Sequence, residues 1–185
     1  MNTNDVRIDE EFRLLSPRLT EEQRRLRVEQ ITAGYQPTIA LWSPHNIVLD
    51  GVEDFEICRE LGLSVYVDQI DLPDRKAAKE WIIRNELSRP CPAPFHRVEL
   101  ALHFEPGFKA EARQRQVYAG RGAKENLTGP SVNVRKRIAA LAEVSEDTVM
   151  KVKEIIKSGD SDLIDKARRG VISVNRACRI VRGQR

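Results

Sequence analysis

Three acidic side chains gather around a glycine turn in the stretch "NIVLDGVEDFEICRELG", residues 46–62. Asp50 ends a short apolar run, and Glu53 and Asp54 begin the helical pattern that follows. Grouped carboxylates can hold Mg²⁺, as a metal-dependent nuclease or nucleotide triphosphatase requires. Acids at a helix start also serve as caps and as partners of the helix dipole. Both interpretations of the turn from Asp50 to Asp54 stay open, and the metal ligands are not fixed by the sequence.

A second pattern with chemical meaning is "VRKRIAALAEVSEDTVMKVKEII", residues 134–156. Its apolar spacing predicts two helices joined by a short turn. The small side chain of Ala139 lets the second helix cross closely, and Val144 fills the gap at the turn. Val149 and Val152 then hold the second helix against the first. This is the pattern of a DNA-binding helix-turn-helix, although an ordinary helical hairpin that binds nothing has similar spacing.

Ser145 is the expected N-cap of the second helix, and Glu143 stands at the turn position that glycine usually holds. If this helix enters the major groove, its N-terminal exposed residues lie near base edges. These residues are Ser145, Glu146, Asp147, Met150 and Lys151. Cations suited to backbone phosphates are Arg135, Lys136, Arg137, Lys153 and Lys157. Further arginines expected to face solvent or DNA are Arg168, Arg169, Arg176, Arg179, Arg182 and Arg185.

The charge is divided unevenly along the chain. Residues 1–108 hold 13 Lys and Arg against 19 Asp and Glu, a net charge of −6. Residues 109–185 hold 18 against 9, a net charge of +9. A basic second half indicates a polyanionic partner, and together with the helix-turn-helix pattern it predicts double-stranded DNA.

Cysteine content and hydropathy narrow the class of protein. The three cysteines, Cys58, Cys91 and Cys178, form neither a disulfide framework nor a C-x-x-C pair. The sequence has no run of eighteen apolar residues and no signal-peptide pattern at its start. We therefore expect a soluble cytoplasmic protein.

Strand and helix patterns alternate before the basic half. Strands are expected at 37–43, 47–50 and 64–72, and helices after Thr20, after Gly51, at 73–88 and at 95–104. Thr20 and Gln23 have the spacing of a capping box. The predicted class is α+β, a small mixed-sheet domain followed by an all-helical domain. The predicted division is a domain at 1–105, a linker with partial helix at 106–133, including the loop 119–131, and a helix-turn-helix domain at 134–185.

The chain resembles the ParB-type family, in which a ParB/sulfiredoxin-like N-terminal domain precedes a helix-turn-helix domain. The resemblance rests on "AGYQPTIALW", "IVLDGVEDFEICRELGL", "DRKAAKEWIIRNELSR" and "IAALAEVSEDTVMKV", in that order. It covers residues 5–105 and 133–182. The sulfiredoxin branch needs a cysteine beside the glycine turn, and this turn has none.

The resemblance implies a site for CTP or ATP with magnesium. The positions that match this site are Gly34, Gln36, Asp50, Gly51, Glu86 and Arg89. Asp54 stands where relatives have a phosphate-binding arginine, and Asn85 and Glu86 hold the family's Glu-Asn pair in reversed order. Because Asp54 would repel a triphosphate, we expect a degenerate site, no cofactor and no enzymatic activity.

The leading hypothesis is a DNA-binding protein of the ParB type, acting in partition, copy control or transcription regulation. The resemblance implies a homodimer, association with the nucleoid or a plasmid, and a partition ATPase or another protein as partner. Two alternatives remain. One is the metal-dependent nuclease or nucleotide triphosphatase described above, and the other is an interaction or inhibitor protein of a mobile element.

Overall fold

The computed structural model describes residues 5–89, 93–120 and 133–183. The chain divides into two compact units, Met1–Ser88 and Arg89–Arg185. The first holds 11 Lys and Arg against 17 Asp and Glu, and the second holds 20 against 11. The net charges of −6 and +9 therefore belong to two separate folding units.

The division lies at residue 88, whereas the sequence analysis placed it at 105. The difference arises because Phe95, Val98 and Ala101, on the helix predicted at 95–104, are buried in the core of the second unit. The spacing of apolar residues on a helix face is the same whichever of two cores buries that face. Periodicity alone therefore cannot assign such a helix to one of two neighbouring units.

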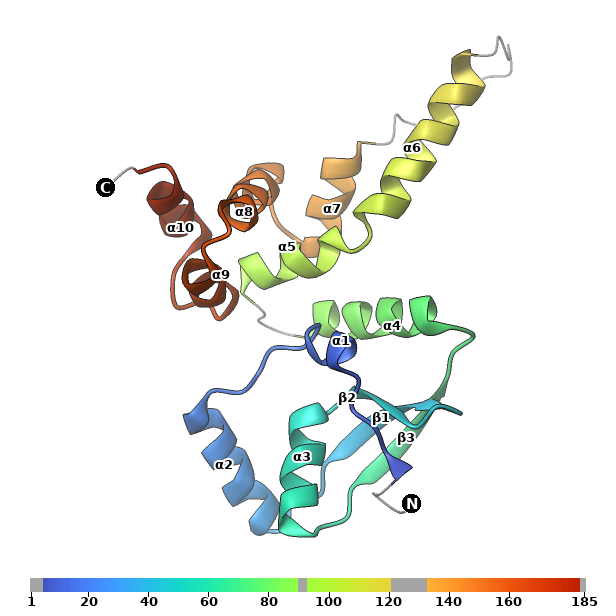
Figure 1. Cartoon of the computed structure of the whole chain (residues 1–185), viewed down its shortest axis with the longest axis vertical. Helices are drawn as coiled ribbons and strands as arrows, with labels where there is room; N and C mark the ends of the chain where they lie inside the picture. Colours follow the sequence, from blue (N-terminus) through green and yellow to red (C-terminus); the bar gives the residue numbers. More distant parts are fainter. Residues whose placement is uncertain (1–4, 90–92, 121–132, 184–185) are drawn as a thin grey trace. The chain divides into compact units, whose positions relative to one another are not determined.

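The first unit is a small α+β domain built on a three-stranded sheet (Figure 1). Its elements are α1 (Glu10–Arg13), α2 (Glu21–Thr32), β1 (Thr38–Ser43), β2 (Ile47–Asp50), α3 (Val52–Leu61), β3 (Tyr66–Asp71) and α4 (Arg75–Ser88). The strand order is β2-β1-β3, with β1 antiparallel to β2 and parallel to β3. The predicted mixed sheet is confirmed.

One core cluster of this unit lies between the sheet and α3. Ile39 and Leu41 of β1, Val48 of β2 and Phe55 of α3 are almost completely buried together. Helix α2 packs on α3, and its start carries the predicted capping box between Thr20 and Gln23. This packing fixes the junction of β2 and α3, where Asp50 ends the strand and Glu53 and Asp54 lie in the first turn of the helix.

In its described residues the second unit contains helices and no strand, as predicted. Its elements are α5 (Pro94–Leu102), α6 (Glu105–Gly120), α7 (Val134–Ala142), α8 (Glu146–Ser158), α9 (Ser161–Arg168) and α10 (Val174–Val181). The predicted linker is helical as far as Gly120, and the remainder of the predicted loop, 121–131, lies outside the described residues. In the described part of the chain, no helix has the length and hydropathy needed to cross a membrane.

An ion pair ties α5 to α9 beside the second core. Arg168 donates from Nε and Nη2 to the two carboxylate oxygens of Glu99, at 2.7 and 2.6 Å. Burial alone would raise the pKa of Glu99, but Arg168 and the nearby His96 outweigh it and lower the pKa to about 2. The pair is geometrically bidentate, the arrangement in which a guanidinium and a carboxylate interact most strongly.

Candidate nucleic-acid interface

Helices α7 and α8 are joined by a turn of three residues, Glu143 to Ser145. Glu143 has a left-handed backbone with φ of +54°, as its turn position predicts. The Ser145 hydroxyl accepts from the backbone N–H of Thr148 at 3.2 Å, which confirms the predicted N-cap. The start of α8 is therefore fixed by local chemistry, and its first turn is exposed enough to meet a ligand.

The predicted inner faces of both helices are buried. Ile138, Ala139 and Ala142 of α7 pack against Val149 and Val152 of α8 in the core of the second unit. Val144, the turn residue expected to fill the gap, is half-buried against the same cluster. The small side chains of α7 let α8 pack closely while its opposite face stays open to solvent.

Arg97 of α5 braces the turn, a role that sequence analysis did not identify. Its Nε donates to the carbonyl oxygen of Ala142 at 2.7 Å, and its Nη2 lies 2.8 Å from a carboxylate oxygen of Glu143. The Arg97 side chain is only 11% exposed. Because 45 residues separate Arg97 from Ala142, no local signal in the sequence links the two.

Four of the predicted DNA-binding cations have carboxylate partners. Arg135 Nε lies 2.7 Å from Glu146 Oε2, and Lys151 Nζ lies 2.6 Å from Asp147 Oδ2. Lys151 also donates to Asn175 Oδ1 of α10 at 2.8 Å. At the start of α8, the structure thus pairs the two acids predicted to lie near DNA base edges, Glu146 and Asp147, with two of the predicted cations.

Arg137 and Lys153 pair with acids of α6. Arg137 bonds Glu111, whose pKa it lowers, and lies over the ring of Phe108. Lys153 Nζ donates to Glu105 Oε1 at 2.7 Å. Both cations are therefore held by carboxylates of α6.

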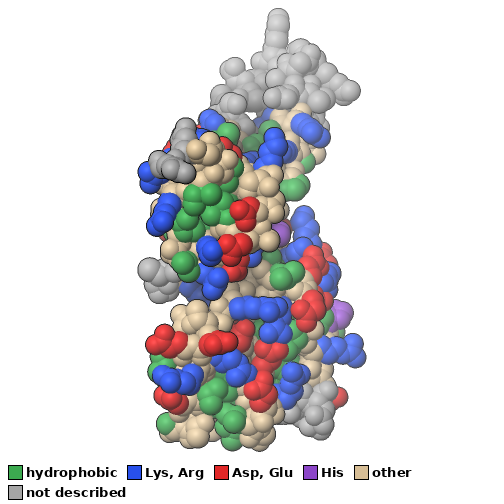
Figure 2. All heavy atoms as spheres, turned by 60° about the vertical axis from the view of Figure 1, so that its left-hand side comes forward, with side chains coloured by type: hydrophobic (Ala, Val, Ile, Leu, Met, Phe, Trp, Pro, Cys, Tyr) green, Lys and Arg blue, Asp and Glu red, His purple; other side chains and the backbone are tan. Residues whose placement is uncertain are grey.

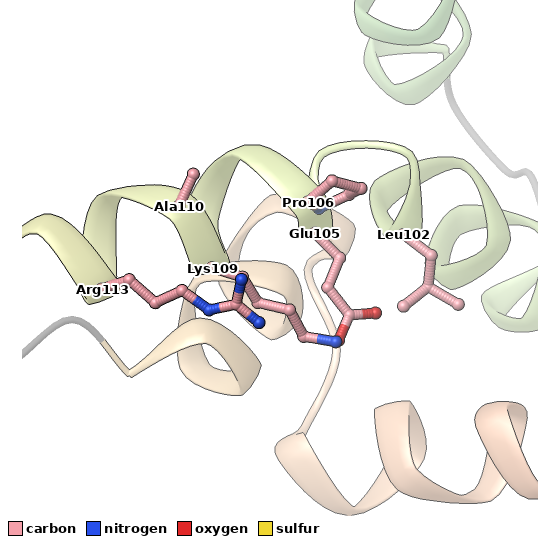
Figure 3. Close-up of a pocket in the computed structure, with 6 residues that line it drawn as sticks. All are labelled: Leu102, Glu105, Pro106, Lys109, Ala110 and Arg113. Atoms are coloured by element: carbon pink, nitrogen blue, oxygen red, sulfur yellow. The ribbon is translucent and has the colours of Figure 1, made fainter.

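Glu105 lines a hollow of about 420 Å³, between Leu102 on one side and Lys109 and Arg113 on the other (Figure 3). Lys109 extends to the Glu105 carboxylate, at 2.9 Å (Figure 3). Glu105 thus accepts from Lys109 and from Lys153 of α8, so the carboxylate that lines the hollow is balanced by two cations.

The remaining predicted residues that the structure describes lie on the surface of the second unit. Lys136, Lys157 and Met150 are exposed, and Met150 retains 49% of its accessible surface. Among the C-terminal arginines, Arg182 pairs with Glu154 of α8, Arg168 with Glu99, and Arg169 with Asp165. Arg176 and Arg179 are exposed on α10, and Arg185 lies outside the described residues.

In the first unit, the acidic turn is tied to α4. Asp50 Oδ1 accepts from the N–H of Gly51 at 2.7 Å, and its Oδ2 accepts from Asn85 Nδ2 at 2.9 Å. Gly51 has φ of +80°, and a Cβ at this position would lie 2.9 Å from Ile39 Cγ2. The turn and the second predicted nucleotide motif thus meet through Asp50 and Asn85.

Glu53 and Asp54 have cationic partners from other helices. Asp54 Oδ1 lies 2.8 Å from Arg27 Nε of α2, and Glu53 lies 4.0 Å from Arg13 Nη2. Sequence analysis did not identify either arginine as a partner of the turn. Each acid of the proposed metal cluster therefore has its own polar partner, and within the described residues no group of three or more His, Cys, Asp or Glu is arranged to hold a metal ion.

The other predicted nucleotide positions lie in separate places. Gly34 and Gln36 line a groove of about 520 Å³ with Leu61, at the C-terminal end of α3. Gly51 precedes the first residue of α3, and a helix of this length spans about 15 Å. Glu86 is buried and Arg89 is exposed. The structure therefore brings Asp50 and Gly51 together at one end of α3 and Gly34 and Gln36 at the other.

On the face drawn in Figure 2, acidic and basic side chains lie beside one another over much of the surface. Ion pairing of this kind lowers the pKa of Glu154, whose carboxylate accepts from Arg182. Many cations of the second unit are therefore balanced by a neighbouring carboxylate, and its net positive charge comes from the remaining cations.

No family model matches this chain, and no curated protein matches it. Among solved structures, it is similar to a structure of the pNOB8-like ParB N-domain, with a TM-score of 0.58 and 17% identity over 97% of this chain and 72% of the other. A second crystal form of a pNOB8-like ParB N-domain gives a TM-score of 0.58 and 16% identity over 97% and 77%. Because these matches span both units, the chain has a ParB-type fold.

Proposed function

We propose that this chain is a DNA-binding protein of the ParB type, which contacts double-stranded DNA through α7 and α8. The observation that carries this proposal is the capped, exposed start of α8, held on a buried apolar face within a unit of net charge +9. The ParB-type fold supports it. On this basis we assign the chain to partition, copy control or transcription regulation, as a cytoplasmic protein associated with the nucleoid or a plasmid.

In the proposed complex, α8 enters the major groove with its first two turns toward the base edges. Met150 offers an apolar contact there, and Glu146 and Asp147 offer acceptors for the amino group of cytosine. The exposed ammonium groups of Lys136 and Lys157 bind phosphates. Phosphate contacts of this type set affinity and position, whereas contacts to base edges set sequence choice.

A fluorescence anisotropy titration at 50 and 200 mM salt tests the proposal, with a random duplex and with genomic fragments. We expect binding that weakens steeply with salt, because cations that bind phosphates release counterions from DNA. Lys136→Gln should weaken binding to all sequences and flatten the salt dependence by about 0.9 in log–log slope. Salt-insensitive or absent binding would contradict the proposal.

The matched control is Lys76→Gln, which removes the same charge from an exposed position on α4 in the first unit. It should leave the affinity within error of the unaltered chain. An equal loss of affinity in both variants would mean that net charge alone attracts the duplex and that Lys136 of α7 does not contact it.

We also propose that the chain binds DNA as a homodimer. One α8 presents only a few side chains to base edges, and helix-turn-helix proteins gain site length by placing two copies on successive half-sites. Sedimentation velocity of the protein, with and without duplex, tests this state. A partition role would add a partition ATPase as partner, which co-purification from cells can test.

A further inference from the structure

We propose that Glu146 and Asp147 restrain non-specific DNA binding by forming ion pairs with Arg135 and Lys151, two cations at the start of α7 and on α8. This inference rests on the DNA-binding function proposed above. It assigns the two acids a role in specificity, because a cation held by a carboxylate contributes less to binding of any phosphate backbone.

The distances place each acid against a cation that would otherwise face DNA. Glu146 Oε2 lies 2.7 Å from Arg135 Nε, and Asp147 Oδ2 lies 2.6 Å from Lys151 Nζ. Arg135 reaches across from the first turn of α7, whereas Lys151 lies one turn beyond Asp147 on α8. Both pairs therefore lie along the face that the proposed complex turns toward the duplex.

Both pairs are open to competition from a phosphate. The Arg135 and Glu146 side chains are 49% and 38% exposed, whereas Lys151 is 24% exposed and its partner Asp147 is 71% exposed. Ion pairs in such high-dielectric surroundings contribute little to folding. A phosphate can reach these cations, but it must replace a carboxylate and so gains less than it would from an unpaired cation.

The fold does not depend on these two acids. The start of α8 is capped by the Ser145 hydroxyl, and the helix is held by Val149 and Val152 in the core. Lys151 has a further partner in Asn175 of α10, which keeps its ammonium group on this surface. A merely structural role would therefore predict a small loss of stability and no gain in DNA binding when the acids are neutralised.

The test compares Glu146→Gln and Asp147→Asn with the unaltered protein, by anisotropy on a random duplex over a salt series. Each variant should bind random DNA about 3- to 10-fold more tightly, with a log–log salt slope steeper by up to about 0.9. The ratio of affinities for a bound genomic fragment and for random DNA should fall correspondingly. Circular dichroism establishes that each variant is folded at the temperature of the titration.

Asp162→Asn is the matched control. Asp162 is also a first-turn aspartate, 72% exposed and paired with a lysine four residues on, but it lies on α9. It should leave DNA affinity unchanged, whereas a gain equal to that of Asp147→Asn would reduce the effect to net charge and overturn the inference. In the Glu146→Gln background, Arg135→Gln should abolish the gain, because the released cation is its source.

The outcomes separate this inference from the function on which it rests. If the unaltered protein binds duplexes and the two variants bind equally or more weakly, the inference fails and the proposed function stands. If neither the unaltered protein nor any variant binds a duplex at 50 mM salt, both fail.

Discussion

Arg27 Nε lies 2.8 Å from Asp54 Oδ1, so an arginine of α2 pairs with an acid in the first turn of α3. The Asp54 side chain is 13% exposed, and the Arg27 guanidinium also lies over the ring of Tyr35, 5.0 Å from its centroid. This geometry gives Asp54 a structural role in joining α2 to α3. The ion pair thus accounts for Asp54 by packing between two helices.

Asp54→Arg should destabilise the protein without creating a CTP site. The change removes a partly buried ion pair and puts like charge beside Arg27, so we expect the free energy of unfolding to fall by about 1–2 kcal/mol. Urea denaturation measures this loss, and calorimetric titration with CTP and Mg²⁺ tests the site. The exchanged pair, Arg27→Asp with Asp54→Arg, should recover part of the stability. CTP binding by Asp54→Arg would instead identify the turn as a disabled phosphate site.

The sequence could predict features that depend on neighbouring residues. The caps at Thr20 and Ser145 and the left-handed turn at Glu143 follow from side chains within a few positions, and all three are present. It could not predict Arg27 beside Asp54 or Arg97 beside Ala142, because tertiary packing alone brings these pairs together. The division at residue 88 was inaccessible for the same reason.

Gly51→Ala should be more destabilising than Gly62→Ala, although both glycines have left-handed backbones at the ends of α3. Their φ angles are +80° and +67°, so a side chain at either costs about 1–2 kcal/mol. At Gly51 the new Cβ also meets Ile39 Cγ2 at 2.9 Å, whereas nothing lies within 4 Å at Gly62. We expect the overlap to add about 1–3 kcal/mol at Gly51, as measured by urea denaturation.

Equal losses at the two glycines would mean that β1 moves aside at no cost. Ile39 is almost completely buried in the core of the first unit, which argues against such a movement. If the extra loss arises from this contact, Gly51→Ala should cost less in an Ile39→Ala background, which lacks Cγ2, than in the unaltered chain.

Glu99 should make the stability of the second unit depend on acid pH. Burial raises its pKa, but Arg168 and His96 outweigh burial and lower the pKa from 4.5 to about 2. Because the folded pKa lies below the unfolded one, this stabilisation is complete above about pH 4.5 and is lost as the pH falls toward 2. Its size is on the order of 3 kcal/mol.

Urea denaturation of the unaltered protein and of Glu99→Gln at pH 7, 4.5 and 3 measures this dependence. The variant should be less stable at pH 7, and the difference should shrink through the acid range because Gln cannot titrate. Glu22→Gln, an exposed position on α2, is the control and should leave the pH profile unchanged. If the free energy of unfolding has the same pH dependence in the unaltered protein and in Glu99→Gln, ionisation of Glu99 beside Arg168 does not stabilise the fold.

Glu143→Gly should stabilise the second unit slightly, whereas Glu143→Ala should destabilise it. The left-handed backbone of Glu143 costs about 1–2 kcal/mol for a residue with a side chain, and glycine avoids this cost. The lost ion pair to Arg97 is worth less, about 0–1 kcal/mol, because the Glu143 carboxylate is 77% exposed. We expect a gain of about 0.5 kcal/mol for glycine after its greater unfolded-state entropy is subtracted.

Alanine at position 143 loses the ion pair and keeps the backbone strain. Thermal denaturation should therefore give a melting temperature above that of the unaltered protein for Glu143→Gly and below it for Glu143→Ala. A loss with glycine as large as that with alanine would mean that the Arg97 pair, and not backbone strain, determines stability at this turn.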